Sequence, residues 1–85
     1  MNKSTKELFS MLKNMKYEYS KDVFGFYFTK GENKFSCIKN GTMYSCYHNR
    51  LIDKQWVLQS KTYQLFDLDN SLLWIIRAIQ SMGSV

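Results

Sequence analysis

The stretch that decides the fold is residues 22–48, DVFGFYFTKGENKFSCIKNGTMYSCYH. Its aromatic side chains alternate along the chain, as in FGFYF, and a strand sends alternate side chains to opposite faces of a sheet. The KGEN segment at 30–33 has the composition of a four-residue loop. Asn40-Gly41 is a strong signal for a two-residue hairpin turn. The pattern predicts three antiparallel strands, over residues 23–29, 34–39 and 42–48.

These two turns fix a register in which Phe28 pairs with Phe35, and Cys37 pairs with Tyr44. Both turns place the same side chains on one face, which we expect to form the core because turn chemistry and pattern agree. The members of this face are Phe24, Phe26, Phe28, Phe35, Cys37, Tyr44 and Cys46.

The opposite face is half apolar and carries Tyr27, Lys34, Ser36, Ile38, Met43, Ser45 and Tyr47. Two interpretations of this face remain open. It is either a binding surface, or it is partly covered by residues 49–66, within which 56–59 is a candidate fourth strand.

A helix is predicted at each end of the chain. The sequence STKE at 4–7 is a capping box that starts the first helix, and Lys6 and Lys13 face away from its apolar side. The last helix is expected to begin near Asp69, as an N-cap, and to end at Gly83. The predicted core stripes are Leu8, Met11, Leu12 and Met15 in the first helix, and Leu72, Ile75, Ile76, Ile79 and Met82 in the last.

Together these elements predict a single α+β domain over residues 1–85. An antiparallel β-meander of four to five strands packs against an N-terminal and a C-terminal helix, in the order α-β-β-β-(β)-α, with a short first strand at 17–20. A domain of 85 residues buries only about 60–65% of its unfolded surface.

The charge favours an acidic partner, either nucleic acid or an acidic protein face, and the hydropathy favours a soluble protein. The net charge is +5, and residues 1–42 hold eight lysines against four acidic residues. Such an excess favours acidic partners. The longest apolar run, LLWII at 72–76, is far shorter than the ~20 residues that span a bilayer. We therefore expect a cytoplasmic protein that does not contact membranes.

Catalytic and metal chemistry are not expected. In the predicted register Cys37, Cys46 and His48 share a face, but the two cysteines are diagonal neighbours roughly 7–8 Å apart. This spacing argues against a disulfide, and a structural zinc site needs a fourth ligand. Asp67 and Asp69 fit helix capping better than acid–base catalysis. The sequence predicts a non-enzymatic protein without a cofactor.

FGFYF with its flanking lysines resembles the aromatic strand motif of RNA-recognition and cold-shock domains, in which exposed aromatic side chains stack on bases. The resemblance covers about five residues and implies a nucleic-acid partner. In this register the phenylalanines belong to the core, which leaves Tyr27 facing outward. The predicted contacts are Tyr27, Lys34 and Tyr47 on the outer face, with Lys6 and Lys13 as phosphate contacts.

The size and layout also resemble small proteins of phages and mobile elements, such as anti-CRISPR and host-takeover inhibitors. This resemblance implies a protein that binds and inhibits another protein, whereas the leading prediction is action on nucleic acid or on a complex that handles it. The alternative is a protein partner, either an inhibited host factor or a second copy in a homodimer. For that alternative the predicted interface is Leu73, Trp74 and Arg77, on the side of the last helix away from its core stripe.

Overall fold

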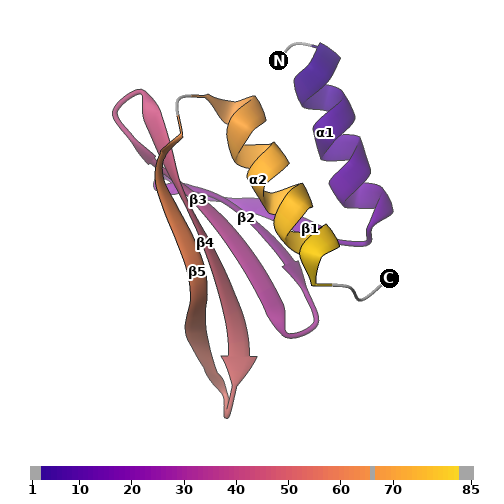
Figure 1. Ribbon diagram of the computed structural model, residues 1–85, viewed down its shortest axis with the longest axis vertical. Coiled ribbons are helices and arrows are strands. Elements are labelled where there is room, and N and C mark those ends of the chain that lie inside the picture. The colour runs from indigo at the N-terminus through magenta and orange to yellow at the C-terminus, as the bar shows by residue number, and fades with distance from the viewer. Residues whose placement is uncertain (1–2, 66, 83–85) are drawn as a thin grey trace.

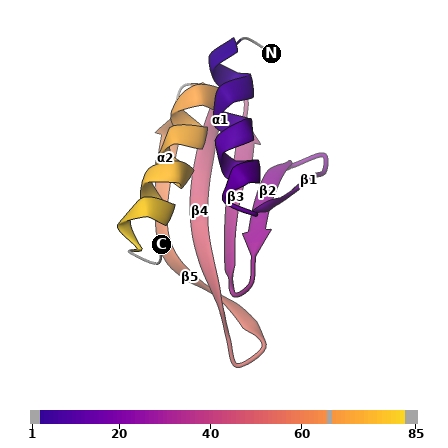
Figure 2. The same ribbon diagram turned by 90° about the vertical axis from the view of Figure 1, so that its right-hand side faces the viewer.

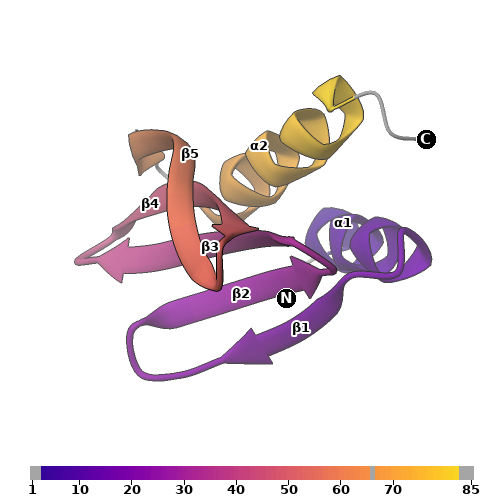
Figure 3. The same cartoon turned by 90° about the horizontal axis from the view of Figure 1, so that it is seen from below.

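The computed structural model describes residues 3–65 and 67–82. Five strands form one antiparallel sheet in the order β1-β2-β3-β4-β5. Both helices cover the same face of this sheet (Figures 1 and 3). The predicted α+β meander is therefore confirmed, with five strands. The elements are α1 (Lys3–Asn14), β1 (Glu18–Lys21), β2 (Gly25–Lys30), β3 (Asn33–Asn40), β4 (Met43–Ile52), β5 (Gln55–Leu65) and α2 (Leu68–Ser81).

Tight turns connect β2 to β3 and β3 to β4. Gly31 and Gly41 are the first central residues of these turns, with φ of 57° and 63°. A positive φ at that position alone is the pattern of a type II′ turn, which favours glycine there. The expected loop over 30–33 is shorter than predicted because Lys30 pairs with Asn33, yet Phe28 pairs with Phe35 as expected.

The second of these turns differs from the prediction. Gly41 and Thr42 form it, and Asn40 pairs with Met43. Cys37 consequently pairs with Cys46 instead of Tyr44. The pairing has moved by two residues, so every side chain keeps its predicted face. The expectation that the two thiols are diagonal neighbours is wrong, because they are directly opposite.

The core lies between the helices and the face predicted for it. Phe35, Cys37 and Cys46 of the sheet are fully buried, as are Leu12 of α1 and Leu72 of α2. The remaining buried apolar side chains are Tyr17, Phe26, Phe28, Ile75 and Ile76.

One residue of the predicted stripe on α1 is misplaced. Met11 is 41% exposed, whereas Phe9 packs on the core with its ring 5.7 Å from that of Phe28. The inward side of α1 centres on Thr5, Leu8, Phe9 and Leu12, with the i, i+3, i+4, i+7 spacing of a helix face. Met11 therefore lies at the edge of this inward side of α1.

Phe24 is a second correction, since its side chain is 66% exposed instead of lying in the core. The Asp22 carboxylate accepts hydrogen bonds from the backbone N–H groups of Phe24, at 2.8 Å, and Gly25, at 3.2 Å. Such an Asx turn replaces strand geometry locally. The turn therefore holds Phe24 outside β2.

The last helix begins two residues earlier than expected, since its N-cap is Asp67 instead of Asp69 and its first residue is Leu68. The Asp67 carboxylate accepts from the backbone N–H of Asn70 at 2.8 Å. Asp69, predicted as the cap, instead accepts a hydrogen bond from the Thr5 hydroxyl and so joins the two helices. The predicted end at Gly83 lies outside the described residues.

The β4–β5 hairpin extends beyond the ends of both helices as an arm (Figures 1 and 2). Its turn residues, Asp53 and Lys54, both have positive φ, at 50° and 66°, as in a type I′ turn. Among the residues that the structure describes, none of the helices has the length and apolar character needed to cross a membrane.

Candidate functional site

The candidate site is the sheet face that the helices leave uncovered, which we call the open face (Figure 3). Tyr27 of β2 pairs with Ser36 of β3, and Ser36 pairs with Tyr47 of β4. The two tyrosines thus lie two strand spacings apart, about 10 Å between their backbones. Both side chains are partly exposed. The register therefore brings the predicted Tyr27 and Tyr47 together on one surface.

Lys34 lies between two aromatic rings of this face. Its Nζ is 5.1 Å from the ring centroid of Tyr27 and 5.8 Å from that of Trp56. These distances are within the range of cation–π attraction. Trp56 comes from β5, where it pairs with Leu51, two strand positions beyond Asn49 on the same face. On the open face, the ammonium group of Lys34 on β3 therefore contacts one ring from β2 and one from β5.

A hydrogen bond orients the Tyr27 ring. Its hydroxyl donates to the Asp22 carboxylate at 2.9 Å and 3.0 Å. Desolvation, the hydrogen bond and the charge of Asp22 together raise the pKa of Tyr27. Desolvation acts to raise the pKa of Asp22, but the hydrogen bonds from Phe24, Tyr27 and Gly25 and the charge of Lys34 outweigh it and lower that pKa. The contact is therefore a charge-assisted bond.

Small side chains fill the middle of the open face. Ser36 is 7% exposed and Ser45 is 4% exposed, so both lie beneath larger neighbours. The Ser45 hydroxyl accepts from the Asn40 amide at 3.3 Å. A ligand that approaches this face therefore meets the aromatic rings and Lys34 first.

The predicted phosphate contacts Lys6 and Lys13 are exposed, but they lie on α1, in the layer on the other side of the sheet (Figure 3). The structure thus brings together Tyr27, Lys34 and Tyr47 and separates Lys6 and Lys13 from them.

The predicted protein interface on α2 is less exposed than expected. Arg77 is exposed and Leu73 is half-buried. Trp74 is also half-buried and packs against the core. Trp74 therefore contacts the core and keeps part of its surface exposed.

Trp56 is the site residue that sequence reasoning missed. Its side chain is 40% exposed, and its neighbours Val57 and Leu58 are 39% and 45% exposed. The sequence interpretation left open whether 56–59, as a candidate fourth strand, partly covers the outer face or leaves it as a binding surface. The Asp53-Lys54 turn carries neither glycine nor asparagine, so no turn signal revealed the hairpin that presents Trp56.

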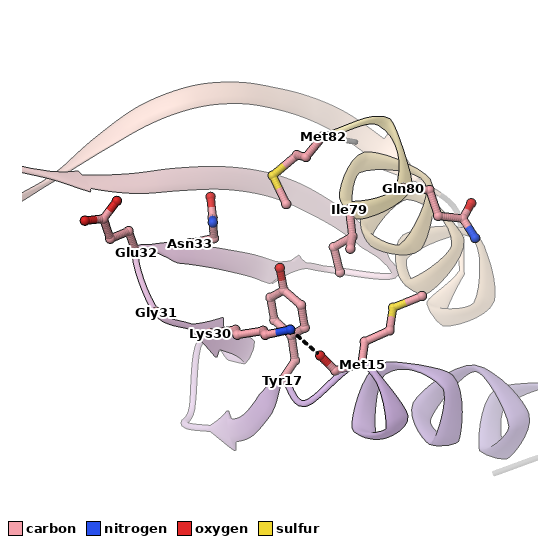
Figure 4. Close-up of a pocket in the computed structure, with 9 residues that line it drawn as sticks. All are labelled: Met15, Tyr17, Lys30, Gly31, Glu32, Asn33, Ile79, Gln80 and Met82. Carbon is pink, nitrogen blue, oxygen red and sulfur yellow. Dashed lines mark hydrogen bonds between the residues drawn. The ribbon is translucent and has the colours of Figure 1, made fainter. Parts of the chain in front are cut away.

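A cavity of about 630 Å³ lies at the opposite layer, between the ends of α1 and α2 and the β2–β3 turn (Figure 4). Three of its polar side chains, those of Lys30, Glu32 and Asn33, already have partners. Lys30 Nζ donates to the Met15 carbonyl at 3.0 Å, and the Glu32 carboxylate is 3.7 Å from the guanidinium of Arg50. The Tyr17 ring also lines it, and burial raises the pKa of this tyrosine.

Two further observations bear on the chemistry of the protein. Within residues 3–65 and 67–82, no group of three or more metal-ligating side chains lies close enough together to hold an ion. Comparisons with protein families, curated proteins and solved structures found no match.

His48 gives a prediction about pH. Its ring stacks on Phe35 at 4.3 Å, and its Nε2 is 2.9 Å from the side-chain oxygen of Asn33. Burial, and then the charge of Arg50, lower the pKa of His48. A histidine with a lowered pKa stabilises the fold above its unfolded pKa, about 6.5, and this stability is lost as the pH falls below it.

We therefore expect the midpoint temperature of thermal unfolding to decrease as the pH is lowered from about 7 to about 5. The decrease should be smaller in a His48→Gln variant, because glutamine cannot ionise. Circular dichroism melts of both proteins across this range would measure the difference. Parallel curves for the two proteins would show that His48 does not contribute.

Proposed function

We propose that this protein is a non-enzymatic binder of single-stranded nucleic acid, which it contacts with the open face. Tyr27, Tyr47 and Trp56 stack on bases, and Lys34 supplies positive charge beside them. The observation that carries the proposal is the presence of aromatic side chains from three strands on the uncovered face, with Lys34 Nζ within 6 Å of two of the rings.

The geometry favours a single strand over a duplex. Base–aromatic stacking requires bases whose faces are free, and each stacked base contributes about 1–3 kcal/mol. A broad sheet face with rings on separate strands offers such platforms to successive unpaired bases. Reading of duplex DNA instead needs a helix or a narrow ribbon that enters the major groove. The net charge of +5 favours the phosphate backbone in either case.

The lysines of α1 have a different role in this proposal. Lys6 and Lys13 do not touch a strand bound on the open face, because the sheet separates them from it. They add to the overall positive field, which accelerates association but does not fix position. Lys34, in contrast, is a direct contact.

Binding of a fluorescently labelled oligothymidylate, followed by anisotropy across a salt series, tests this proposal. We expect Tyr27→Ala and Trp56→Ala each to raise Kd by about tenfold, as the loss of one stacked base predicts. Lys34→Ala should raise Kd and reduce the slope of log K against log salt by about one phosphate contact.

Two matched controls carry exposed side chains that are not among the proposed contacts. Phe24→Ala removes an aromatic ring that is 66% exposed, and Lys13→Ala removes an exposed lysine of α1. Both should leave Kd within about twofold, since neither touches the strand. Absence of binding at low salt, or an equal effect of Lys13→Ala and Lys34→Ala, would contradict the proposal.

The arm favours a second candidate, a homodimer through the β5 edge. The strand QWVLQSKTYQL is eleven residues long and contains one charged residue. Within the part of the chain that the structure describes, its strand neighbour is β4 alone. Natural sheet edges are commonly protected by charges or proline, and this strand has little of either. Sedimentation analysis would reveal such a dimer, and Val57→Lys should dissociate it. A concentration-independent monomer would exclude this candidate.

A further inference from the structure

The strongest unexplained feature of the core is a pair of thiols. Cys37 of β3 and Cys46 of β4 are direct cross-strand partners, and their sulfur atoms are 3.1 Å apart. Both side chains are fully buried. Neither residue has a part in the open face or in the proposed function.

The strand geometry suits a covalent bond between them. The Asn40–Met43 pair closes a two-residue hairpin, and such a pair is hydrogen-bonded. Alternation along an antiparallel ladder then makes Cys37–Cys46 a non-hydrogen-bonded pair, with Cα atoms about 4.5 Å apart. Disulfides span Cα separations of about 4.4–6.8 Å. Bond formation therefore needs a sulfur displacement of about 1 Å and no change in strand pairing.

The surroundings also distinguish the two thiols. Hydrogen bonds from Cys37 and Ser71 lower the pKa of Cys46, although burial opposes this. The same hydrogen bond, together with burial and the charge of Cys46, raises the pKa of Cys37. The hydrogen bond from Ser71 favours Cys46 as the attacking thiolate.

We propose that Cys37 and Cys46 are a modification site that forms an intramolecular disulfide when the protein meets a small-molecule disulfide such as oxidised glutathione. The Cys46 thiolate attacks one glutathione sulfur and releases the first glutathione. Cys37 then loses its proton, attacks the sulfur of Cys46 and releases the second. The two protein thiols lose two electrons and two protons, and the glutathione disulfide gains both to become two glutathione thiols.

The disulfide would fasten the two strands that carry the centre of the core. It closes a short loop in the unfolded chain, and this loop closure favours the folded state. By linkage, the folded state favours the disulfide by the same factor. The oxidised protein should consequently unfold about 5–15 °C above the reduced protein.

The test measures thiol oxidation in defined glutathione buffers, once with the native protein and once in denaturant. Each equilibrium is quenched by alkylation and analysed by mass spectrometry. We expect the oxidised native protein to be two hydrogen atoms lighter than the reduced protein and to carry no glutathione. The equilibrium constant for disulfide formation should be at least tenfold greater in the native protein than in the denatured protein. In a parallel experiment, denatured protein is refolded in the same buffers. The thiols then meet glutathione before they are buried, so their burial cannot slow the approach to equilibrium.

Cys37→Ala and Cys46→Ala are the matched controls, because a single thiol can form only a mixed disulfide with glutathione. The wild-type comparison decides the matter if either variant fails to fold. Equal preference in the native and denatured protein, or a predominance of glutathione adducts or intermolecular dimers, would overturn the proposal.

Discussion

Phe35→Ala is expected to lower the free energy of unfolding by about 3–5 kcal/mol, as a large cavity in a core does. Phe35 is fully buried on the central strand of the sheet. Its ring lies 5.9 Å from that of Tyr17 and 4.3 Å from that of His48. A domain of this length has a total stability of about 4–13 kcal/mol. The substitution therefore removes a large part of it.

Phe24→Ala is the matched control for this prediction. The Phe24 side chain is 66% exposed, and exposed substitutions of this kind usually change stability by within about 0.5 kcal/mol. Urea unfolding followed by circular dichroism compares the two variants, and Phe35→Leu provides an intermediate if Phe35→Ala does not fold. Similar losses for Phe24→Ala and Phe35→Ala would contradict the assignment of the core.

The second large effect is expected for Gly25→Ala. A Cβ atom at Gly25 would lie 1.9 Å from the backbone oxygen of Cys37 and 2.9 Å from its carbonyl carbon. Gly25 pairs with Ile38, and the backbone cannot yield without separating β2 from β3. We expect a loss of about 3 kcal/mol or more, at the upper end of overpacking effects.

Gly31→Asn tests whether this effect is steric and local. Gly31 has a φ of +57°, and a Cβ there would meet nothing within 4 Å. Asparagine is among the residues that type II′ turns accept besides glycine, so the loss should stay below about 2 kcal/mol. Both variants can be compared in one series of urea melts. If Gly25→Ala is no worse than Gly31→Asn, the close approach of β2 and β3 at Gly25 is wrong.

The alternation of side chains in the central strands was sufficient to predict the two faces of the sheet. It was not sufficient for the exact pairing of β3 with β4, because Gly41 can occupy either central position of a two-residue turn. The type II′ turn over Gly41 and Thr42 moved the pairing by two residues. Since the shift is even, the core face remained correct, while the contact between Cys37 and Cys46 could not be seen.

The candidate site was predictable only in part. Tyr27, Lys34 and Tyr47 share the open face as the alternation required. Trp56 depends on a turn at Asp53 and Lys54, whose positive φ values have no clear signal in these residue types. Phe24 continues the aromatic pattern, but it lies just before β2. The Asp22 carboxylate forms a local hydrogen-bonded turn that competes with sheet pairing and delays the start of the strand.

Nuclear magnetic resonance tests most directly whether the open face is the surface that contacts single-stranded nucleic acid. Amide and side-chain signals of the isotope-labelled protein would be followed during titration with an oligothymidylate at low salt. We predict that the largest shift changes occur at Tyr27, Lys34, Tyr47 and Trp56, while the signals of α1 remain in place. An unchanged spectrum, or changes centred on Lys6 and Lys13 of α1, would contradict this account.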